Sequence, residues 1–356
     1  IDPDGPGRHE FVQRLHTLYR RVACVPYSAK QPLLEQLHNS AKGQWNCDFD
    51  PYRQGNPVHV LYQLNIGDKT VSALGMGTPT IEGKDGSAQL TPEYLGFGRS
   101  YKRNRKKHLF VLNQNPIPKT GIAAYVINGD ETARCDLILD AQNREDLKGA
   151  IYAIALSKNS EFYSQKGPYK NLHDAEIFIK TLYDEVFVKL RQESGCYIPQ
   201  GVRDSIEGFE KKTHSIMKAI HSEVFENSKH LNVEERRLFI ELYYDHLTKF
   251  IIKELNVESF NISCKDAIDR GAGSNAQLFS NCAIVSDEKG EISIGHQKKI
   301  ETLMMARALF VRKRAPIHER FERFAEGLDF SLSHVEAMKN LHKAVFGDLK
   351  IIPVNT

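Results

Sequence analysis

The chain has 356 residues, of which 41% are hydrophobic and 26% are charged. This composition is typical of a globular protein with a sizeable core, and it excludes an intrinsically disordered chain. The 48 basic and 45 acidic residues nearly balance, so the chain as a whole is not expected to bind nucleic acid or another polyanion. No apolar run reaches the roughly 18 residues of a membrane-spanning helix, so no transmembrane segment is expected.

The cysteines argue against a disulfide framework and against a zinc site. They are few and contain no C-x-x-C pair, which leaves zinc ribbons and thioredoxin-like redox motifs without support. We therefore expect reduced thiols in a soluble protein of a reducing compartment, and neither a metal ion nor another cofactor. The six are Cys24, Cys47, Cys135, Cys196, Cys264 and Cys282.

The first part of the chain is predicted to change from helix to strand. Helical spacing of apolar residues predicts helices over about 8–23 and 32–41. From about 57 to 140 the pattern favours strands, and apolar alternation on both sides of Gly67-Asp68 predicts a hairpin. Asn128-Gly129 predicts a second hairpin turn, followed by a returning strand over Cys135–Leu139. This region is therefore expected to form a mostly antiparallel sheet.

The rest of the chain is predicted to be helical, apart from one short strand over about Val257–Ser263. Three long helices are expected within about 170–256, as a helical insertion or subdomain. Gly195 is predicted to cap the first of them, and Asn232 with Glu235 resembles a capping box ahead of the third. Further helices are expected from about residues 272, 297, 318 and 332.

These patterns predict an α/β (or α+β) fold with a central mixed β-sheet and a large helical part. We expect a single domain over 8–356, and two domains are the alternative. The segment Ile1–Gly7 is rich in proline and glycine and is expected to lie outside the fold.

The strongest chemical signal lies in residues 260–275, which read as a strand, a tight loop and a helix. Cys264 and Arg270 are separated by five residues, and a loop of this length can wrap its backbone N–H groups around one phosphate. The helix behind it adds its own N–H groups and the positive end of its dipole. Arg270 can hold two phosphate oxygens with its planar guanidinium, and these positive surroundings favour the nucleophilic thiolate of Cys264.

The same spacing occurs once more, from Cys47 to Arg53. We reject that segment because Pro51 has no N–H to donate and the bulky side chains of Phe49 and Tyr52 would crowd the loop. Gly271, Gly273 and Ser274 follow Arg270 directly, whereas the segment after Arg53 lacks such a glycine-rich continuation that starts a helix. A buried cysteine beside a surface arginine in an ordinary turn is the structural alternative for the Cys264 segment.

The heptapeptide 264–270, Cys-Lys-Asp-Ala-Ile-Asp-Arg, resembles the P-loop of the C-x5-R phosphoinositide phosphatases. Its C-x-D-x-(Leu/Ile)-D-R pattern is similar to the Sac family of lipid phosphatases. Lys265 and Asp269 resemble the loops of bacterial effector phosphatases of the SopB and SidP type. The resemblance implies a phosphatase domain with a P-loop over 264–270, a helical C-terminal part over 271–350, a phosphocysteine intermediate and no cofactor.

Positions carried over from the resemblance imply roles for individual residues. Cys264 would be the nucleophile, Arg270 the phosphate clamp, and Lys265 would face a second phosphate on the inositol ring. Many C-x5-R enzymes have Ser or Thr after the arginine, whereas this chain has Gly271, so Ser274 is predicted to substitute for it. The further residues expected to bind substrate are Ala267, Ile268, Gly271 and Ser274.

The leaving alkoxide needs a proton from a general acid. Asp269 and Asp266 are the two candidates within the loop. Either carboxylate could instead brace the loop by accepting hydrogen bonds, and the sequence leaves both alternatives open.

Two basic clusters lie outside the loop. The larger one is predicted to attract anionic lipid headgroups, at about 1 kcal/mol per basic side chain, and its alternative is a solvated loop between strands. No nucleic-acid-binding motif accompanies it. The second, Arg312-Lys313-Arg314, is predicted to serve the C-terminal end of a helix. The larger cluster consists of Arg99, Lys102, Arg103, Arg105, Lys106 and Lys107.

We therefore expect a cysteine-dependent phosphatase that acts on phosphoinositide headgroups and associates peripherally with anionic membrane surfaces. A phosphatase of phosphoproteins or soluble inositol phosphates is the first alternative, and a non-enzymatic module that binds anionic lipids is the second. The resemblance further implies a secreted bacterial effector that works in the host cytoplasm at endomembranes.

Overall fold

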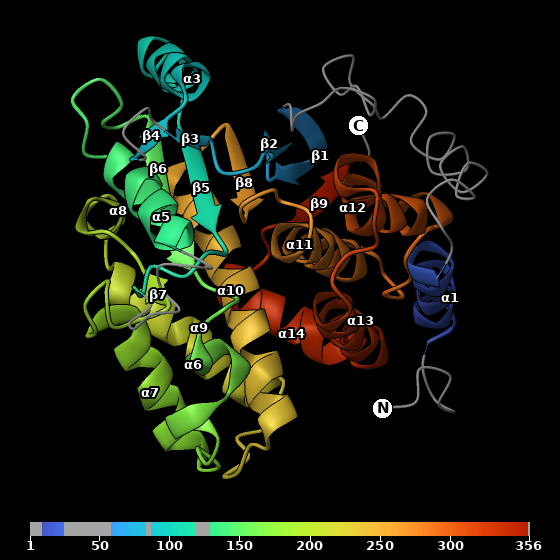
Figure 1. Cartoon of the computed structure of the whole chain (residues 1–356). Helices are drawn as coiled ribbons and strands as arrows, with labels where there is room; N and C mark the ends of the chain where they lie inside the picture. Colours follow the sequence, from blue (N-terminus) through green and yellow to red (C-terminus); the bar gives the residue numbers. More distant parts are fainter. Residues whose placement is uncertain (1–8, 25–57, 83–86, 119–128, 355–356) are drawn as a thin grey trace. The chain divides into compact units, whose positions relative to one another are not determined.

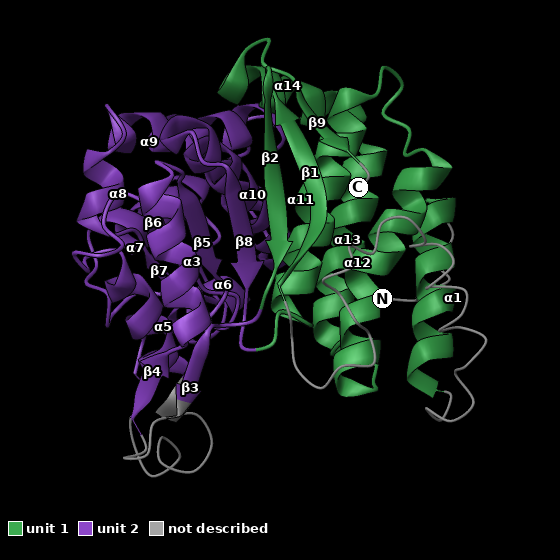
Figure 2. Ribbon diagram, turned by 90° about the horizontal axis from the view of Figure 1, so that it is seen from above, with its two compact units in different colours: residues 1–76, 266–356 green, residues 77–265 purple. Residues whose placement is uncertain are grey.

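The computed structural model describes residues 9–24, 58–82, 87–118 and 129–354 (Figure 1). The chain divides into two compact units, the first made of 1–76 and 266–356, the second of 77–265 (Figure 2). The second unit is thus inserted into the sequence of the first. Each unit contains strands and helices, so the fold is mixed α/β, as predicted. Whether 8–356 folds as one domain stays a prediction.

The first unit contains three antiparallel strands in the order β2-β1-β9. The predicted hairpin is confirmed as β1 (His59–Ile66) and β2 (Lys69–Gly75). Its turn places Gly67 at φ +59°, a conformation that glycine adopts without the steric cost of a side chain. The third strand, β9 (Ile351–Val354), was not predicted, because four residues are too few to show the alternation of apolar and polar residues that is typical of a strand.

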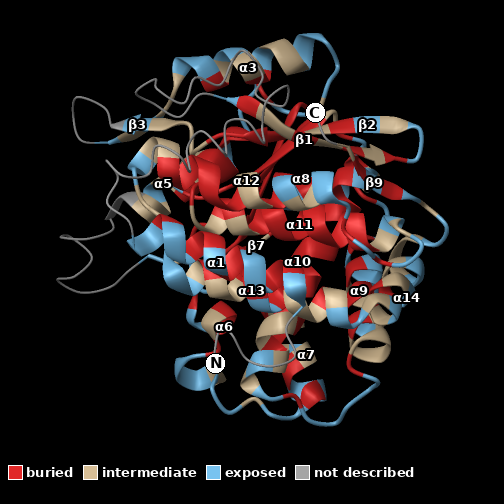
Figure 3. Cartoon of the chain, turned by 90° about the vertical axis from the view of Figure 1, so that its right-hand side faces the viewer, coloured by how far each residue is buried: buried red, intermediate tan, exposed pale blue. Residues whose placement is uncertain are grey.

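The described helices of the first unit lie close to the positions that the sequence predicted for them. The central helix α11 is buried on almost all sides (Figure 3) and contacts α12, α13, α14 and β9. From β1, Tyr62 packs edge-on against Phe279 of α11 at 5.2 Å and donates a hydrogen bond to Asn275 at 3.3 Å. The helices are α1 (Glu10–Cys24), α11 (Arg270–Ser286), α12 (Ile294–Arg312), α13 (His318–Ser333) and α14 (Val335–Phe346).

The strands of the second unit lie in the order β7-β6-β5-β8. The central strand β5 pairs in parallel with both β6 and β8, while β7 is antiparallel to β6. Every residue of β5, β6 and β8 is buried, as expected for parallel strands covered on both faces. The strands are β5 (His108–Leu112), β6 (Ile151–Leu156), β7 (Cys196–Tyr197), β8 (Ser259–Ser263) and a separate hairpin of β3 (Thr80–Glu82) and β4 (Ala88–Leu90).

Two predictions about these strands are wrong. The expected antiparallel sheet is found in the first unit, whereas β5, β6 and β8 of the second are parallel. The region of β6 was expected to be helical, because its uninterrupted apolar run, Ile-Tyr-Ala-Ile-Ala-Leu, cannot be assigned to strand or helix from periodicity. The strand expected near 257–263 is confirmed as β8.

The three long helices predicted within 170–256 are confirmed as α7, α9 and α10. Asn232 and Glu235 form the expected capping box, with reciprocal hydrogen bonds of 3.0 and 2.7 Å. The helices of this unit are α3 (Pro92–Arg103), α5 (Gly129–Ala141), α6 (Glu161–Ser164), α7 (Ala175–Phe187), α8 (Gln200–Asp204), α9 (Phe209–Glu223) and α10 (Val233–Leu255), with a 3₁₀ turn over Gly167–Tyr169.

Two further expectations in this unit are corrected. The strand predicted over Cys135–Leu139 is part of α5, because its buried side chains recur at helical spacing, at Cys135, Ile138 and Leu139. Gly195 does not cap α7, which ends at Phe187. The expected helix near 32–41, the strand before Asn128 and the Cys47–Arg53 segment lie outside the described residues.

Candidate active site

Cys264 is the first residue after β8, at the carboxyl end of the parallel strands. The neighbouring strand β5 ends at Leu112, which pairs with Ser263, the last residue of β8, and it is followed by Asn113 and Gln114. Ligands of parallel sheets bind at this edge because the loops that follow the strands converge there. Cys264 is only 4% exposed. The structure thus places the predicted nucleophile at the edge of the sheet where a site is expected.

Hydrogen bonds from outside the loop orient its first two peptide groups. The hydroxyl groups of Ser263 and Thr78 donate to the Cys264 carbonyl at 2.8 and 3.3 Å, and the Thr78 amide donates to the Lys265 carbonyl at 3.0 Å. In a trans peptide the N–H of the next residue points opposite to the carbonyl. The amides of Lys265 and Asp266 therefore point away from Thr78.

The middle of the loop has an unusual backbone conformation. Ala267 is buried and has φ +54°, a left-handed conformation that costs a non-glycine residue about 1–2 kcal/mol. Such residues are components of the concave arrangements of N–H groups that bind anions. The next side chain, Ile268, is also buried. The hydrophobic contacts of these two side chains can offset the cost of this backbone conformation.

Both loop carboxylates accept hydrogen bonds from arginines that follow in the same unit. Arg312 donates through Nε and Nη2 to one oxygen of Asp266, at 3.2 and 2.6 Å. Arg314 forms a bidentate pair with Asp269, at 2.9 and 2.8 Å. The amide of Ile317 adds a third hydrogen bond to Asp269 at 2.9 Å. These contacts favour the alternative in which both carboxylates brace the loop over the alternative in which one of them is the general acid.

The contacts also correct the expectation for the basic triplet Arg312-Lys313-Arg314. Two of its side chains bind loop carboxylates instead of the end of α12, while the backbone N–H groups of Lys313 and Arg314 donate to carbonyls of the last turn of the helix. The sequence does show a basic cluster at the end of a helix, which is a signal that these arginines bind negatively charged groups. The sequence does not show that the partners are Asp266 and Asp269, because more than 40 residues separate each arginine from its aspartate.

The end of the loop confirms the predicted order of strand, loop and helix. β8 ends at Ser263 and α11 begins at Arg270. Arg270 is partly exposed, Lys265 is exposed, and Gly271 and Ser274 are buried in the first turns of α11. The first N–H groups of a helix have no acceptor within the helix, so the start of α11 is suited to an anion.

Thr78 and Gln114 are site residues that the sequence did not reveal. The single hydrogen of the Thr78 hydroxyl is shared between the Oε1 atom of Gln114, at 3.1 Å, and the carbonyl of Cys264, at 3.3 Å. Gln114 is fully buried, and its Nε2 group has no hydrogen-bond partner within the described part of the chain. Neither residue belongs to a recognisable motif, so only the tertiary structure brings Thr78 to Cys264 and Gln114 to Thr78.

The larger basic cluster lies on α3 and the segment that follows it, which corrects the alternative of a loop between strands. Three of its side chains make contacts within the unit: Arg99 with the carboxylate of Asp146, Lys102 with the carbonyl of Glu145 and Lys107 with the carbonyl of Leu255. The other three, Arg103, Arg105 and Lys106, are exposed.

Comparisons of the chain with models of protein families, with curated proteins and with solved structures find no match. Among the residues that the structure describes, no three His, Cys, Asp or Glu side chains are grouped as a metal site would require. Within the same residues, no helix has the length and apolar character needed to cross a membrane.

Proposed function

We propose that the chain is a cysteine-dependent phosphatase that removes a phosphate from phosphoinositide headgroups. One observation carries the proposal: Cys264 directly follows the buried parallel strand β8, and Arg270 is the first residue of α11. A strand, a loop of five intervening residues and a helix can supply the nucleophile, backbone amides and the guanidinium that phosphoryl transfer requires. The left-handed Ala267 within the loop supports this arrangement.

In the proposed reaction, the Cys264 thiolate attacks phosphorus and the bond to the inositol oxygen breaks. The leaving alkoxide takes a proton, and the phosphate remains bound to sulfur. Water then attacks phosphorus, breaks the P–S bond, releases inorganic phosphate and restores the thiolate. Arg270 and the loop amides stabilise the charge that develops on the phosphate oxygens in both steps.

The substrate class rests on the basic side chains and on the resemblance of the loop. Lys265 is exposed next to the nucleophile, where a cation can bind a second ring phosphate. Arg103, Arg105 and Lys106 are exposed on the same unit, and such a group attracts anionic membrane surfaces.

Phosphate release from a panel of phosphoinositides in vesicles tests the proposal. We expect release by the wild-type chain and loss of activity, by a factor of 1,000 or more, in Cys264→Ser, because an alcohol is not ionised at neutral pH. Arg270→Lys is expected to lose about 100-fold or more, since it removes bidentate binding of the transition state. Cys24→Ser and Cys47→Ser are the matched controls, and Cys24 is exposed.

The panel also separates the alternatives. Faster turnover of a phosphotyrosine peptide or of soluble inositol phosphates than of the lipids would favour the first alternative. Vesicle binding without phosphate release from any substrate would favour a lipid-binding module. Equal activity of Cys264→Ser and the wild-type chain would reject the proposed nucleophile.

A further inference from the structure

The phenol of Tyr19 is connected to Asp269 through a single peptide group of the first unit. Its hydroxyl donates a hydrogen bond to the carbonyl of Pro316 at 3.1 Å. The amide of Ile317, which belongs to the same peptide bond, donates to Asp269 at 2.9 Å. This peptide bond is trans, so its carbonyl and its N–H point in opposite directions. One flat group is therefore held from both sides, by α1 on one side and by Asp269 on the other.

The sequence of α1 places Tyr19 on the buried face of that helix, which packs against α12 and α13 (Figure 2). The ring of Tyr19 stacks on Phe321 of α13 at 4.2 Å, and His16 packs edge-on against the same ring of Phe321 at 5.1 Å. These contacts give the hydroxyl a defined position from which to donate. The buried apolar residues of α1 recur at helical spacing: Phe11, Val12, Leu15, Leu18, Tyr19 and Val22.

The hydroxyl of Tyr19 is a donor at neutral pH, and its acceptor is shielded from water. Burial raises the pKa of Tyr19, and the carboxylate of Glu322 raises it further, so the phenol keeps its proton. Tyr19 is only 8% exposed, and Pro316 is buried as well. Removal of the hydroxyl would take a donor from a buried carbonyl, which is unfavourable where water cannot replace it.

The peptide between Pro316 and Ile317 lies in the short connection of α12 and α13, which contacts Asp269 twice. Arg314 and Ile317 supply the donors of Asp269 and stand on either side of Pro316 in the sequence. Hydrogen bonds in a chain polarise one another, so the contact with Tyr19 strengthens the Ile317 amide as a donor. Asp269 directly precedes Arg270. A tilt of this peptide would therefore reach the arginine of the proposed site.

We propose that Tyr19 is a positioning residue for Asp269 and Arg270. It acts through the peptide of Pro316 and Ile317, and in this role it does not touch the substrate. The kinetic consequence rests on the proposed phosphatase activity, whereas the coupling between Tyr19 and Asp269 can be measured without any activity. The alternative is that Tyr19 only packs α1 against the first unit.

Kinetics of Tyr19→Phe test the proposal on the full chain. The substitution removes the hydroxyl and keeps the ring against Phe321. We expect the turnover number on a phosphoinositide in vesicles to fall about fivefold, the effect of losing one hydrogen bond of ordinary strength. The KM should stay close to the wild-type value, because the groups that bind the headgroup remain and only the fit to the transition state is impaired.

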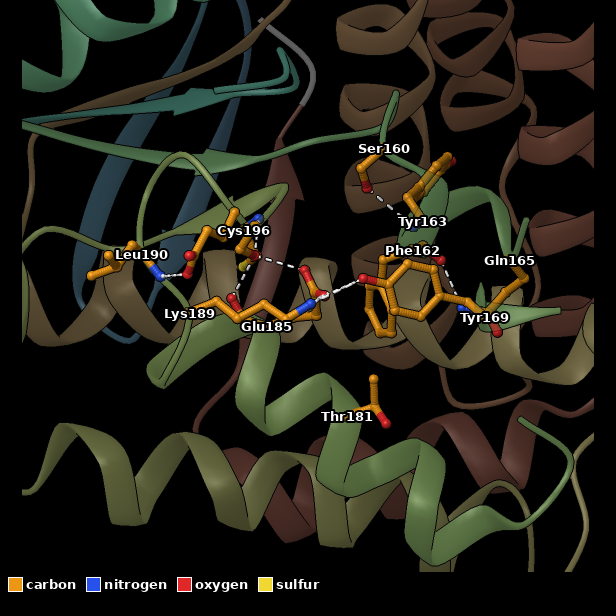
Figure 4. A network of polar contacts seen from close by, with 12 residues as sticks. Ser160, Phe162, Tyr163, Gln165, Tyr169, Thr181, Glu185, Lys189, Leu190 and Cys196 are labelled. Atoms are coloured by element: carbon orange, nitrogen blue, oxygen red, sulfur yellow. Dashed lines mark hydrogen bonds and ion pairs between the residues drawn. The ribbon is translucent and has the colours of Figure 1, made fainter. Parts of the chain in front are cut away.

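Tyr169→Phe in the second unit is the matched control. The hydroxyl of Tyr169 donates to the buried carboxylate of Glu185 at 2.8 Å and accepts a hydrogen bond from Lys189 at 3.0 Å (Figure 4). The variant likewise loses a tyrosine hydroxyl from a polar network, but the contacts of that hydroxyl include no residue of the loop 264–270. It should lower the midpoint of urea unfolding by a comparable amount or more and leave the turnover number unchanged.

A double variant shows whether Tyr19 acts through Asp269. Asp269→Ala removes the acceptor of the Ile317 amide, so adding Tyr19→Phe should lower the turnover number by no more than about twofold further. Independent effects would instead multiply, and the second substitution would again cost about fivefold. The same cycle is measured by urea unfolding, where the two substitutions together should destabilise the chain by less than the sum of their separate effects.

Two outcomes would overturn the proposal. The first is a turnover number of Tyr19→Phe that equals that of the wild-type chain, and the second is the same loss in the presence and absence of the Asp269 carboxylate. If the wild-type chain releases no phosphate from any phosphoinositide, the proposed function fails and the unfolding cycle alone decides. A coupled loss of stability then supports the positioning of Asp269 by Tyr19, and an additive loss rejects it.

Discussion

The carboxylate of Asp269 and the guanidinium of Arg314 are joined by two hydrogen bonds, of 2.9 and 2.8 Å. This bidentate pair connects the residue before Arg270 to the segment between α12 and α13. Asp269 also accepts the amide of Ile317 at 2.9 Å. A carboxylate with three donors is suited to hold the loop in place, and this contact favours a bracing role for Asp269 over the role of general acid in the proposed reaction.

We predict that Asp269→Asn and Arg314→Ala have the same effect. Each should lower the free energy of unfolding by about 1 kcal/mol, a modest figure because the Arg314 side chain is 42% exposed and solvent screens the pair. Each should lower the turnover of a phosphoinositide by about tenfold or more, since a misplaced loop binds the transition state poorly.

An aryl phosphate separates this role from that of a general acid. Its leaving group needs no proton, so loss of an acid would leave its hydrolysis nearly unchanged. We expect Asp269→Asn to lose as much activity on the aryl phosphate as on the lipid. Two results together would instead identify Asp269 as the acid. Asp269→Asn would hydrolyse the aryl phosphate at the wild-type rate, and Arg314→Ala would keep normal activity on the lipid.

The left-handed conformation of Ala267 leads to a second prediction. Ala267→Gly should keep activity and relieve about 1 kcal/mol of backbone strain, because glycine adopts φ +54° readily. Ala267→Val should lose most activity, since a β-branched side chain is strongly disfavoured at positive φ. Steady-state kinetics with urea unfolding checks both, and equal activity of the two variants would show that the loop does not need this conformation.

Thr78 provides a third prediction. Thr78→Val removes the hydroxyl that contacts Cys264 and Gln114 and leaves the buried Oε1 of Gln114 without this donor. We expect the free energy of unfolding to fall by about 1–3 kcal/mol and the turnover number to fall with it, because the first peptide of the loop loses an anchor. Thr78→Ser, which keeps the hydroxyl, serves as the control and should stay close to the wild type in urea unfolding and in kinetics.

The fourth prediction concerns the pH dependence of stability. Burial lowers the pKa of His108 to about 4, and the hydrogen bond to Asn261 at 2.8 Å only partly opposes this shift. In the unfolded chain the pKa is about 6.5, so between these two values the unfolded state binds more protons. The stability that neutral His108 contributes is thus complete above pH 6.5 and is lost as the pH falls towards 4.

Urea unfolding at pH 7 and pH 5 measures this effect. The wild-type chain should lose about 2 kcal/mol between the two pH values through His108, on top of the contributions of other groups. His108→Gln removes the titrating group, so the variant should lose correspondingly less over the same interval. An identical pH dependence in both proteins would show that His108 is not shifted.

The local patterns of the chain predicted those elements whose period is unambiguous. The β1–β2 hairpin, the capping box of Asn232 and Glu235, and the helices α7, α9, α10 and α11 follow from spacing and cap residues alone. The region of β6 and the α5 segment over Cys135–Leu139 were assigned wrongly. There, a short apolar run or a turn dipeptide fits both strand and helix, and only packing decides between them.

The sequence by itself determined that Cys264 and Arg270 stand at the two ends of a loop between a buried strand and a helix, because those elements are local. Only the tertiary structure decided what holds the loop. Within the second unit, Thr78 contacts Cys264, and within the first unit Arg312 and Arg314 contact Asp266 and Asp269, each from more than 40 residues away in the chain. Such contacts depend on which chain segments pack together, and a single sequence contains no local pattern that states this.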